Sequence, residues 1–240
     1  MSNNYFEFKK FKVFQDRCAM KVGTDGTLLG AWACGGDTIL DIGTGTGLVA
    51  LIMAQRFPSA TVTAVEIDQS ACIQARENFS SSPFSSRIRI VESSIQDFSM
   101  RFDESMDNQK FDAIVCNPPY FVDSLNCPDA QRNIARHAIT LDYSALFRCV
   151  SRLLSEQGTF SAVLPAETFS LFDCAARMAG FRCIRKCAVK TVPRKPVRRY
   201  LLSYSRSRIY SYEECEVCLC DAHGSKTEWY DSLTSKLYIK

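Results

Sequence analysis

A short glycine-rich segment sets the strongest constraint on the fold. An apolar stretch, 38–42, runs into the sequence Asp41-Ile42-Gly43-Thr44-Gly45-Thr46-Gly47, and an apolar segment of helical length, 48–56, follows it. Glycines at such a junction let the backbone turn sharply and approach a ligand closely at the N-terminus of the helix. A buried strand, a tight turn and a helix in this order are typical of α/β proteins, which bind ligands at the carboxyl ends of parallel strands.

Strand and helix patterns alternate along the rest of the chain. Apolar and β-branched runs indicate further strands at 61–67, 87–92, 111–116 and 159–164. Asp68 and Asp142 stand where the N-caps of two intervening helices are expected. Residues 183–192 and 200–205 flank two prolines and are expected to form a hairpin. This order predicts one α/β domain with a mainly parallel sheet and helices on both faces.

A second acid helps to identify the ligand. Glu66 lies at the end of the second strand, where its carboxylate can accept hydrogen bonds from ribose hydroxyls. A dinucleotide-binding fingerprint would need glycine at position 48, which is leucine, and here the third glycine comes one residue early. The combination resembles the S-adenosylmethionine loop of class I methyltransferases. We therefore expect S-adenosylmethionine as the cofactor and S-adenosylhomocysteine as its product, with contacts from Asp41, Gly43, Gly45, Gly47 and Glu66.

A polar motif follows the strand predicted at 111–116. Asn117-Pro118-Pro119-Tyr120 matches the Asn-Pro-Pro-Tyr motif of amino methyltransferases. The exocyclic amine of adenine is a poor nucleophile, because its lone pair is delocalised into the ring. The side-chain oxygen of Asn117, which is also expected to border the cofactor, and the Pro118 carbonyl can accept hydrogen bonds from that amine and orient its lone pair. The two prolines stiffen the motif, and Tyr120 can stack on a flipped base.

The most specific resemblance lies near the N-terminus. The stretch from Asp16 to Trp32, preceded by Phe8-Lys9-Lys10-Phe11, closely resembles the start of the bacterial tRNA(Val) adenine-37 N6-methyltransferases. The resemblance extends through the motifs above and, more weakly, to the C-terminus. It implies a Rossmann-like class I methyltransferase fold with a seven-stranded, mainly parallel sheet. It also implies methylation of N6 of adenine 37 in tRNA(Val), with the anticodon arm of the tRNA as the partner.

The order of the predicted elements divides the chain. Residues 1–36 precede the first predicted strand and are expected to form an N-terminal extension that packs on the cofactor pocket, and 37–240 are expected to form the methyltransferase domain. Within the extension, the same resemblance implies that Lys21, Thr24 and Asp25 contact the cofactor and close over its pocket.

Two further cofactor contacts are implied. Ile67 is expected to contact the cofactor beside Glu66. Many class I enzymes bind the cofactor adenine with an acid after the third strand, and this chain has Ser94 at that position. A hydroxyl bonds more weakly than a carboxylate, so Asp97 is an alternative.

Positive charge is concentrated in one part of the chain. The segment from Arg182 to Arg208 contains ten basic residues and no acid, whereas the rest of the chain carries 19 basic and 26 acidic residues. Such a segment can track the phosphate backbone of RNA. We therefore expect it to bind tRNA, chiefly through Arg194, Lys195, Arg198 and Arg199.

Two alternatives to this RNA surface remain open. Arg198 or Arg199 could pair with an acid from the C-terminal stretch instead of phosphate. The RNA would then bind elsewhere, on basic residues near the N-terminus with aromatic residues between them that stack on unpaired bases: Lys9, Lys10 and Lys12 with Phe8 and Phe11.

Two other functions compete with tRNA methylation. The Asn-Pro-Pro-Tyr motif also occurs in enzymes that methylate a glutamine side chain in release factors, because the lone pair of a planar amide nitrogen is delocalised as it is in adenine. Another RNA base is a further possible target. The basic segment counts against a protein substrate. A catalytically inactive RNA-binding module is the third possibility, and the intact Asn117 and glycine loop count against it.

The remaining sequence features predict an intracellular protein without metal. Cys215, Cys218, Cys220 and His223 are packed too closely for the usual zinc site, and alternation over 217–220 favours a strand. The N-terminus has no apolar segment typical of a secretion signal, and the longest apolar run, 47–54, is too short to span a bilayer. We therefore expect a cytoplasmic protein with reduced thiols, no membrane contact and no obligate protein partner.

Overall fold

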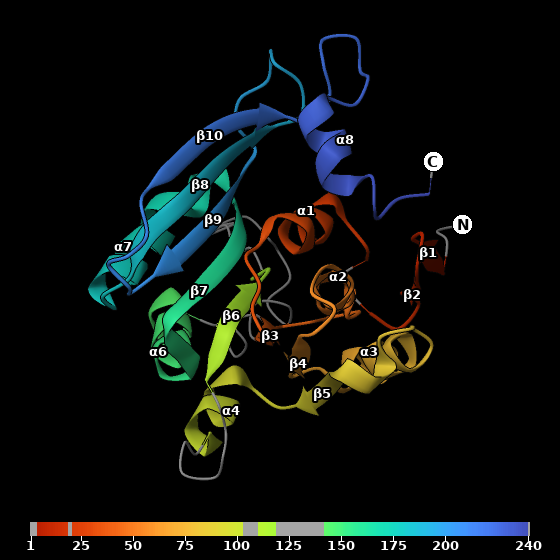
Figure 1. The fold of residues 1–240 in the computed structure, drawn as a ribbon, viewed down its shortest axis with the longest axis vertical. Helices are drawn as coiled ribbons and strands as arrows, with labels where there is room; N and C mark the ends of the chain where they lie inside the picture. The colour runs from red at the N-terminus through yellow and green to blue at the C-terminus, as the bar shows by residue number, and fades with distance from the viewer. Residues whose placement is uncertain (1–3, 19–20, 103–109, 119–141, 240) are drawn as a thin grey trace, which may run out of the picture.

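An eight-stranded sheet forms the centre of the molecule (Figure 1). The computed structural model describes residues 4–18, 21–102, 110–118 and 142–239. The strand order is β10-β8-β9-β7-β6-β3-β4-β5. These strands are β3 (Thr38–Ile42), β4 (Thr61–Glu66), β5 (Ile88–Glu92), β6 (Phe111–Cys116), β7 (Leu154–Pro165), β8 (Arg182–Lys190), β9 (Arg199–Ser205) and β10 (Glu213–Cys218).

The direction of the strands defines where a ligand can bind. Strand β9 is antiparallel to both β7 and β8, and the other neighbouring pairs are parallel. The chain order reverses at β3, which pairs with β4 on one side and with β6 on the other. In open α/β sheets, ligands bind at such a switch point, outside the carboxyl ends of the strands.

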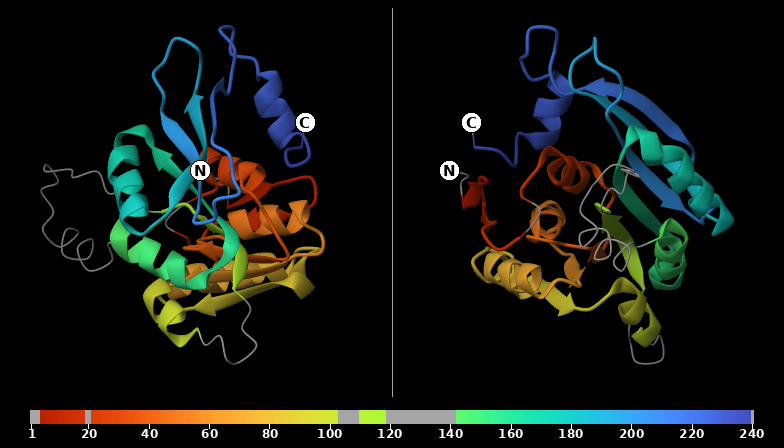
Figure 2. Two further views of the ribbon diagram at one scale, coloured as in Figure 1. Left: turned by 60° about the vertical axis from the view of Figure 1, so that its left-hand side comes forward. Right: turned by 180° about the vertical axis from the view of Figure 1, so that it is seen from behind.

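Helices cover both faces of the sheet (Figure 2). Side chains alternate along each strand, so Ile39 joins one hydrophobic cluster and Leu40 the other. On the Ile39 side lie α1 (Thr24–Trp32), α2 (Leu48–Arg56), α3 (Gln69–Ser80) and α8 (Glu228–Thr234). On the Leu40 side lie α4 (Ile95–Arg101), α6 (Tyr143–Leu153) and α7 (Phe169–Met178). Short 3-10 turns occur at Ser85–Arg87 and Ala166–Thr168.

Both predicted N-caps are present. Asp68 Oδ1 accepts a hydrogen bond from Ala71 N at 2.7 Å, and Asp142 Oδ1 accepts one from Ser144 N at 3.2 Å. These contacts satisfy backbone donors at the starts of α3 and α6. The predicted α/β fold with helices on both faces is therefore confirmed, together with the hairpin of β8 and β9.

The sheet has one strand more than the seven that the resemblance implies. Strand β10 pairs in parallel with β8 at the edge of the sheet. Opposite charges accompany this pairing: ion pairs join Arg185 to Glu213 at 3.4 Å, Lys186 to Glu214 at 2.9 Å and Lys190 to Glu216 at 2.5 Å. The alternation seen at 217–220 therefore belongs only in part to a strand, which begins earlier and ends at Cys218.

The N-terminal aromatic residues are packed inside the protein. Strands β1 (Tyr5–Glu7) and β2 (Lys12–Phe14) form a two-stranded antiparallel sheet. Between them, Phe8 and Phe11 are 2% and 5% exposed, and their rings stack with centroids 4.8 Å apart. The alternative in which Phe8 and Phe11 stack on RNA bases is therefore wrong, because both rings belong to the hydrophobic core.

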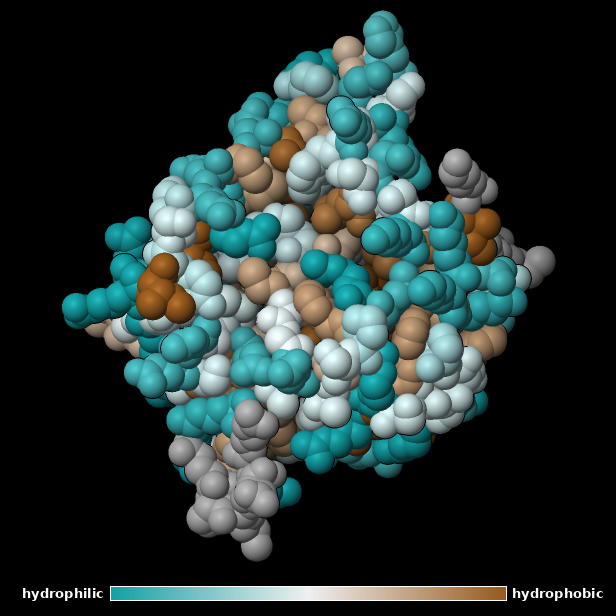
Figure 3. Space-filling view, in the orientation of Figure 1, coloured by the Kyte–Doolittle hydropathy of each residue, from teal (hydrophilic) through white to brown (hydrophobic). Residues whose placement is uncertain are grey.

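One face of the molecule can be judged for its polarity (Figure 3). Figure 3 shows hydrophobic side chains separated by hydrophilic ones on the face that it draws. Within the described segments, no helix is both long and apolar enough to cross a membrane.

Candidate active site

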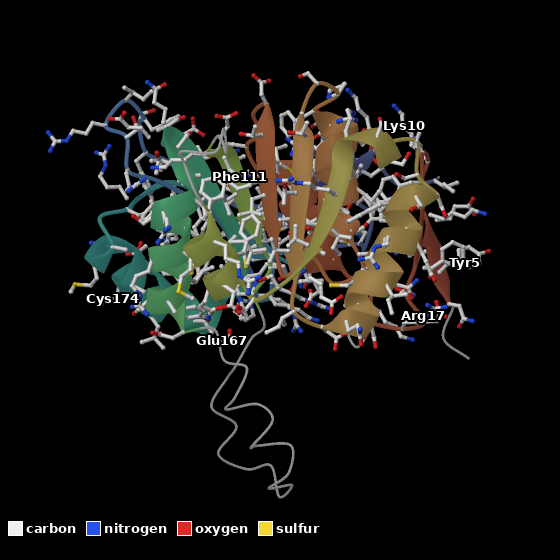
Figure 4. All side chains as sticks on the ribbon, turned by 90° about the horizontal axis from the view of Figure 1, so that it is seen from below. Tyr5, Lys10, Arg17, Phe111, Glu167 and Cys174 are labelled. Atoms are coloured by element: carbon white, nitrogen blue, oxygen red, sulfur yellow. The ribbon has the colours of Figure 1, made fainter. Side chains whose placement is uncertain are left out.

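The predicted site residues follow three neighbouring strands. The glycine loop comes after β3, Glu66 ends β4 and Asn117 comes directly after β6. In the register of the sheet, Ile42 lies opposite Cys116 and also opposite Val65. Gly43, Glu66 and Asn117 therefore leave the sheet side by side, at its switch point. Figure 4 views the molecule along another direction and labels Glu167, which follows β7 at the same edge.

The glycine loop adopts a conformation that L-residues with side chains avoid. Gly43, Gly45 and Gly47 have φ values of 68°, 55° and 84°. A Cβ atom at Gly43 or Gly45 would meet nothing within 4 Å, so open space lies directly beside the backbone there. At Gly47 a Cβ would approach Phe79 Cε1 to 2.4 Å, so this glycine is needed for close packing of α3.

Asp41 holds the glycine loop through buried hydrogen bonds. Its carboxylate is 1% exposed and accepts hydrogen bonds from Thr44 Oγ1 at 2.6 Å and from Ala50 N at 3.1 Å. Burial raises the pKa of Asp41 to about 7, although these two hydrogen bonds favour its charged form. Asp41 thus contacts the loop and the start of α2.

Glu66, at the end of the neighbouring strand β4, also holds the glycine loop. One carboxylate oxygen accepts a hydrogen bond from Gly45 N at 2.9 Å, and the other accepts from Ile67 N at 2.8 Å and Asp68 N at 3.0 Å. The glycine loop is also joined to β4 by a hydrogen bond from Gly43 N to Val65 O at 2.9 Å. The side chain of Ile67 is 58% exposed.

The two candidates for the adenine contact are bonded to each other. Ser94 is the N-cap of α4: its hydroxyl accepts from Asp97 N at 3.0 Å and donates to Asp97 Oδ2 at 2.8 Å. The backbone of Ser93 is attached to the end of β4 through a hydrogen bond to Glu66 O at 2.8 Å. Both side chains thus lie just after the end of β5, which is separated by β4 from β3 and its glycine loop.

The described part of the catalytic motif consists of Asn117 and Pro118. Asn117 is partly buried and Pro118 is buried. The preceding Cys116 is 2% exposed, and burial raises the pKa of its thiol well above the usual value. Pro119 and Tyr120 lie outside the described residues, so their predicted roles are not addressed by the structure.

The N-terminal segment reaches the site along α3. Two buried amides on this helix hold it: Asn78 exchanges hydrogen bonds with Phe14 N and O at 2.8 and 2.9 Å, and Gln74 Oε1 accepts from Arg17 N at 3.0 Å. Asn78 also donates to Thr46 O in the glycine loop at 2.8 Å. Sequence reasoning missed this pair, although two amides one helical turn apart on the apolar side of a helix were a possible signal.

The chain then enters α1 beside the loop. Lys21 is exposed, and Thr24 and Asp25 form the first turn of α1. A Cβ at Gly26 would lie 3.1 Å from Leu48 Cδ2, so this turn packs on the first residue after the glycine loop. Asp25 forms an ion pair with Arg199 at the start of β9.

The basic segment does not present ten equivalent charges. Arg185, Lys186 and Lys190 pair with β10, and Arg199 pairs with Asp25. The expectation that Arg199 binds phosphate is therefore unsupported, and the acid it pairs with comes from α1 and not from the C-terminal stretch. Arg182 and Arg206 donate to Ser207 O and Ser151 Oγ. The structure gives no side-chain partner among the described residues to four members: Arg194, Lys195, Arg198 and Arg208.

Three of these four residues lie in one loop. Residues 191–198 connect β8 to β9 at the edge of the sheet where the parallel strands end, because Val189 pairs with Arg199 and Arg199 with Pro165. Arg194, Lys195 and Arg198 are exposed there. In Figure 1 this loop projects at the top of the molecule.

The cysteine-rich C-terminal stretch is dispersed. Cys215 is exposed on β10, and Cys218 and Cys220 are partly buried. Among the residues that the structure describes, no group of three or more His, Cys, Asp or Glu side chains is arranged to hold a metal ion.

Comparison with known proteins defines the class first. The family model for the methyltransferase small domain matches residues 28–169. A solved structure described as a predicted O-methyltransferase from Agrobacterium tumefaciens superposes with a TM-score of 0.68 at 20% identity, covering 89% of this chain and 96% of that chain. A glycopeptide N-methyltransferase in complex with S-adenosylmethionine gives a TM-score of 0.52 at 15% identity, over 78% of this chain and 100% of that chain. The fold is that of a class I methyltransferase.

Curated relatives then define the family. A protein of Bacteroides fragilis is 47% identical over 242 residues, covering 100% of both chains, and one of Pseudoalteromonas translucida is 40% identical over 98% of both chains. Both are named tRNA1(Val) (adenine(37)-N6)-methyltransferase. The chain therefore belongs to the family of tRNA1(Val) (adenine(37)-N6)-methyltransferases, which confirms the resemblance noted in its sequence.

The raised pKa of Asp41 predicts a pH-dependent stability. Because folding raises this pKa to about 7, the associated stability is fully present below the unfolded pKa and is lost as the pH rises through the folded value. Between about pH 6 and about pH 8 the protein should lose roughly 1 kcal/mol relative to the Asp41→Asn variant, which does not titrate. Urea unfolding of both proteins at several pH values measures this difference, and a constant difference would contradict it.

Proposed function

We propose that the protein transfers a methyl group from S-adenosylmethionine to the N6 amine of adenine 37 in tRNA(Val). The observation that carries this proposal is the position of Asn117 beside the glycine loop, in a chain that is 47% identical over its full length to a relative with that named activity. The basic loop 191–198 at the same edge of the sheet favours RNA over a protein amide as substrate.

The residues around the loop fit the cofactor. Open space beside Gly43 and Gly45 lets a ligand approach the backbone, and the half-buried Glu66 carboxylate can exchange its backbone donors for ribose hydroxyls. S-adenosylmethionine would supply an electrophilic methyl group at this position. Residues 1–36 complete the pocket in this proposal, with Lys21, Thr24 and Asp25 beside the loop, and Ile67 and Ser94 at the neighbouring strand ends.

Asn117 and Pro118 act on the target base in this proposal. The Asn117 side-chain oxygen and the Pro118 carbonyl each accept one hydrogen bond from the N6 amine. These bonds turn the lone pair toward the methyl donor and stabilise the positive charge that builds on nitrogen. The methylated amine is acidic enough to lose its extra proton to solvent, so no base with a shifted pKa is needed. A tRNA substrate also implies that the reaction takes place in the cytoplasm.

Replacement of Glu66 tests the cofactor site. Glu66→Ala should weaken S-adenosylmethionine binding by roughly 1–3 kcal/mol, because charge-assisted hydrogen bonds are lost. Glu66→Gln should have a smaller effect, because its one acceptor oxygen can still hold either Gly45 N or the ligand. Isothermal titration calorimetry measures both. Unchanged affinity in Glu66→Ala would remove the ribose assignment, and binding of NAD instead of S-adenosylmethionine would remove the cofactor itself.

Replacement of Asn117 tests the chemical step. Asn117→Ala should retain most of its cofactor affinity but lose roughly a hundredfold or more in rate, by analogy with removal of one oxyanion-hole donor. The loss should appear in single-turnover methylation of unmodified tRNA, because the hydrogen bond strengthens as charge develops. If the single-turnover rates of the variant and the wild type agree, Asn117 has only a structural role in the turn after β6.

Replacement of the basic loop tests RNA binding. The triple variant Arg194→Ala, Lys195→Ala, Arg198→Ala should flatten the dependence of log affinity for tRNA on log salt, by a little under one unit per lost phosphate contact. Arg76→Ala, Arg101→Ala, Arg148→Ala removes the same charge from exposed positions on α3, α4 and α6 and serves as control. Equal slopes for the two triple variants would place the RNA on another surface.

A further inference from the structure

A cavity lies away from the glycine loop and Asn117. It has a volume of about 530 Å³ and is bordered by α7, by the first half of β8 and by Tyr212 just before β10. Its lining includes Phe169, Asp173, Arg177, Arg182, Lys186 and Tyr212. This size lies within the range of small-ligand pockets.

The chain just before β10 contributes Tyr212 to the lining of this cavity. Tyr212 donates a hydrogen bond from its hydroxyl to Glu214 Oε2 at 2.8 Å, and Glu214 in turn pairs with Lys186 at 2.9 Å. The pairing of β10 with β8 therefore holds the Tyr212 ring at the cavity, although its side chain is 53% exposed. A fixed, exposed aromatic ring beside basic residues is a surface on which a nucleobase can stack.

Two guanidinium groups, those of Arg177 and Arg182, also line the cavity. Asp173, only 8% exposed, accepts hydrogen bonds from Arg177 Nε at 2.8 Å and from the Tyr204 hydroxyl at 3.2 Å. The Arg177 side chain is 75% exposed, and because its bond to Asp173 uses Nε, its two terminal nitrogens remain for a ligand. Arg182 is exposed and donates one terminal nitrogen to Ser207 O.

The charges of the cavity leave a positive surplus. Asp173 and Glu214 are each engaged with a basic partner, Arg177 and Lys186, and Arg182 adds a further positive charge. Guanidinium groups bind phosphate with paired, directed hydrogen bonds. A nucleotide carries both a phosphate that guanidinium groups can bind and a base that can stack on an aromatic ring, and this cavity is lined by both kinds of side chain.

The cavity also lies on a path from the candidate active site. Helix α7 begins four residues after β7 ends, at the edge where Asn117 leaves the sheet, and it runs from there along the cavity. Figure 4 shows this path from Glu167 at that edge to Cys174 on α7. An RNA strand whose target base lies at Asn117 can continue along α7 toward the cavity.

We propose that this cavity is a second nucleotide site for the tRNA. Arg177 and Arg182 hold a backbone phosphate, and the Tyr212 ring stacks on a base other than the methylated one. The inference rests on the proposed function, since it takes tRNA as the substrate, and it extends that function to a nucleotide outside the catalytic pocket.

The test measures tRNA affinity of matched variants by fluorescence anisotropy. Arg177→Ala with Arg182→Ala should raise the Kd for unmodified tRNA roughly tenfold and lower the salt slope by a little under one unit per phosphate contact. Tyr212→Ala should raise the Kd roughly tenfold through lost stacking, whereas Tyr212→Phe keeps the ring and should stay within about twofold. Arg76→Ala with Arg101→Ala removes the same charge from α3 and α4 and should have a smaller effect.

Further measurements separate binding from folding. Arg177→Ala leaves Asp173 without its basic partner, so thermal unfolding is recorded for every variant. Arg182→Ala alone breaks no ion pair that the structure gives among the described residues, and it should still raise the Kd by about threefold or more.

The outcomes distinguish this inference from the proposed function. If wild type binds and methylates tRNA while the cavity variants match it, or match the Arg76 and Arg101 control, the cavity is not a nucleotide site and the proposed function stands. If wild type neither binds nor methylates tRNA, both proposals fail.

Discussion

Two carboxylates hold the backbone of the glycine loop. Asp41 accepts hydrogen bonds from Thr44 and Ala50 beneath the loop, and Glu66 accepts one from Gly45 at its side. A loop built on glycines with positive φ has few side chains to fix its shape, so these backbone contacts determine where it stands. The end of α3 contacts this loop directly, because Phe79 lies against Gly47 and Asn78 donates to Thr46 O, and α1 packs on Leu48, the first residue after the loop.

Features that depend on neighbouring residues could be predicted from the sequence. The stretches at 38–42 and 48–56 are β3 and α2 as expected, because strand patterning, glycine turns and helical periodicity are local. The proximity of Gly43, Glu66 and Asn117 to one another could also be predicted, because residues at the carboxyl ends of adjacent parallel strands share one edge of the sheet. For Pro119 and Tyr120, which lie outside the described residues, the motif remains a prediction.

Features that depend on distant partners could not be predicted. Arg199 pairs with Asp25, 174 positions away, and nothing in the spacing of either residue indicates the other. Strand β10 pairs with β8 through complementary charges that a count of basic residues within one segment overlooks. Phe8 and Phe11 alternate with lysines as RNA-stacking residues do, yet both turn inward. The charge available to a polyanion is therefore a property of the folded chain.

The position of β9 has a consequence for synthesis of the protein. Strand β9 lies between β7 and β8, although it follows both in the chain. While a ribosome has made only the first 198 residues, β7 therefore has one edge without its hydrogen-bonding partner, in the middle of the future sheet. An unpaired edge of this kind can join to another chain. Synthesis of β9 therefore decides whether the nascent domain closes its sheet or remains exposed to aggregation.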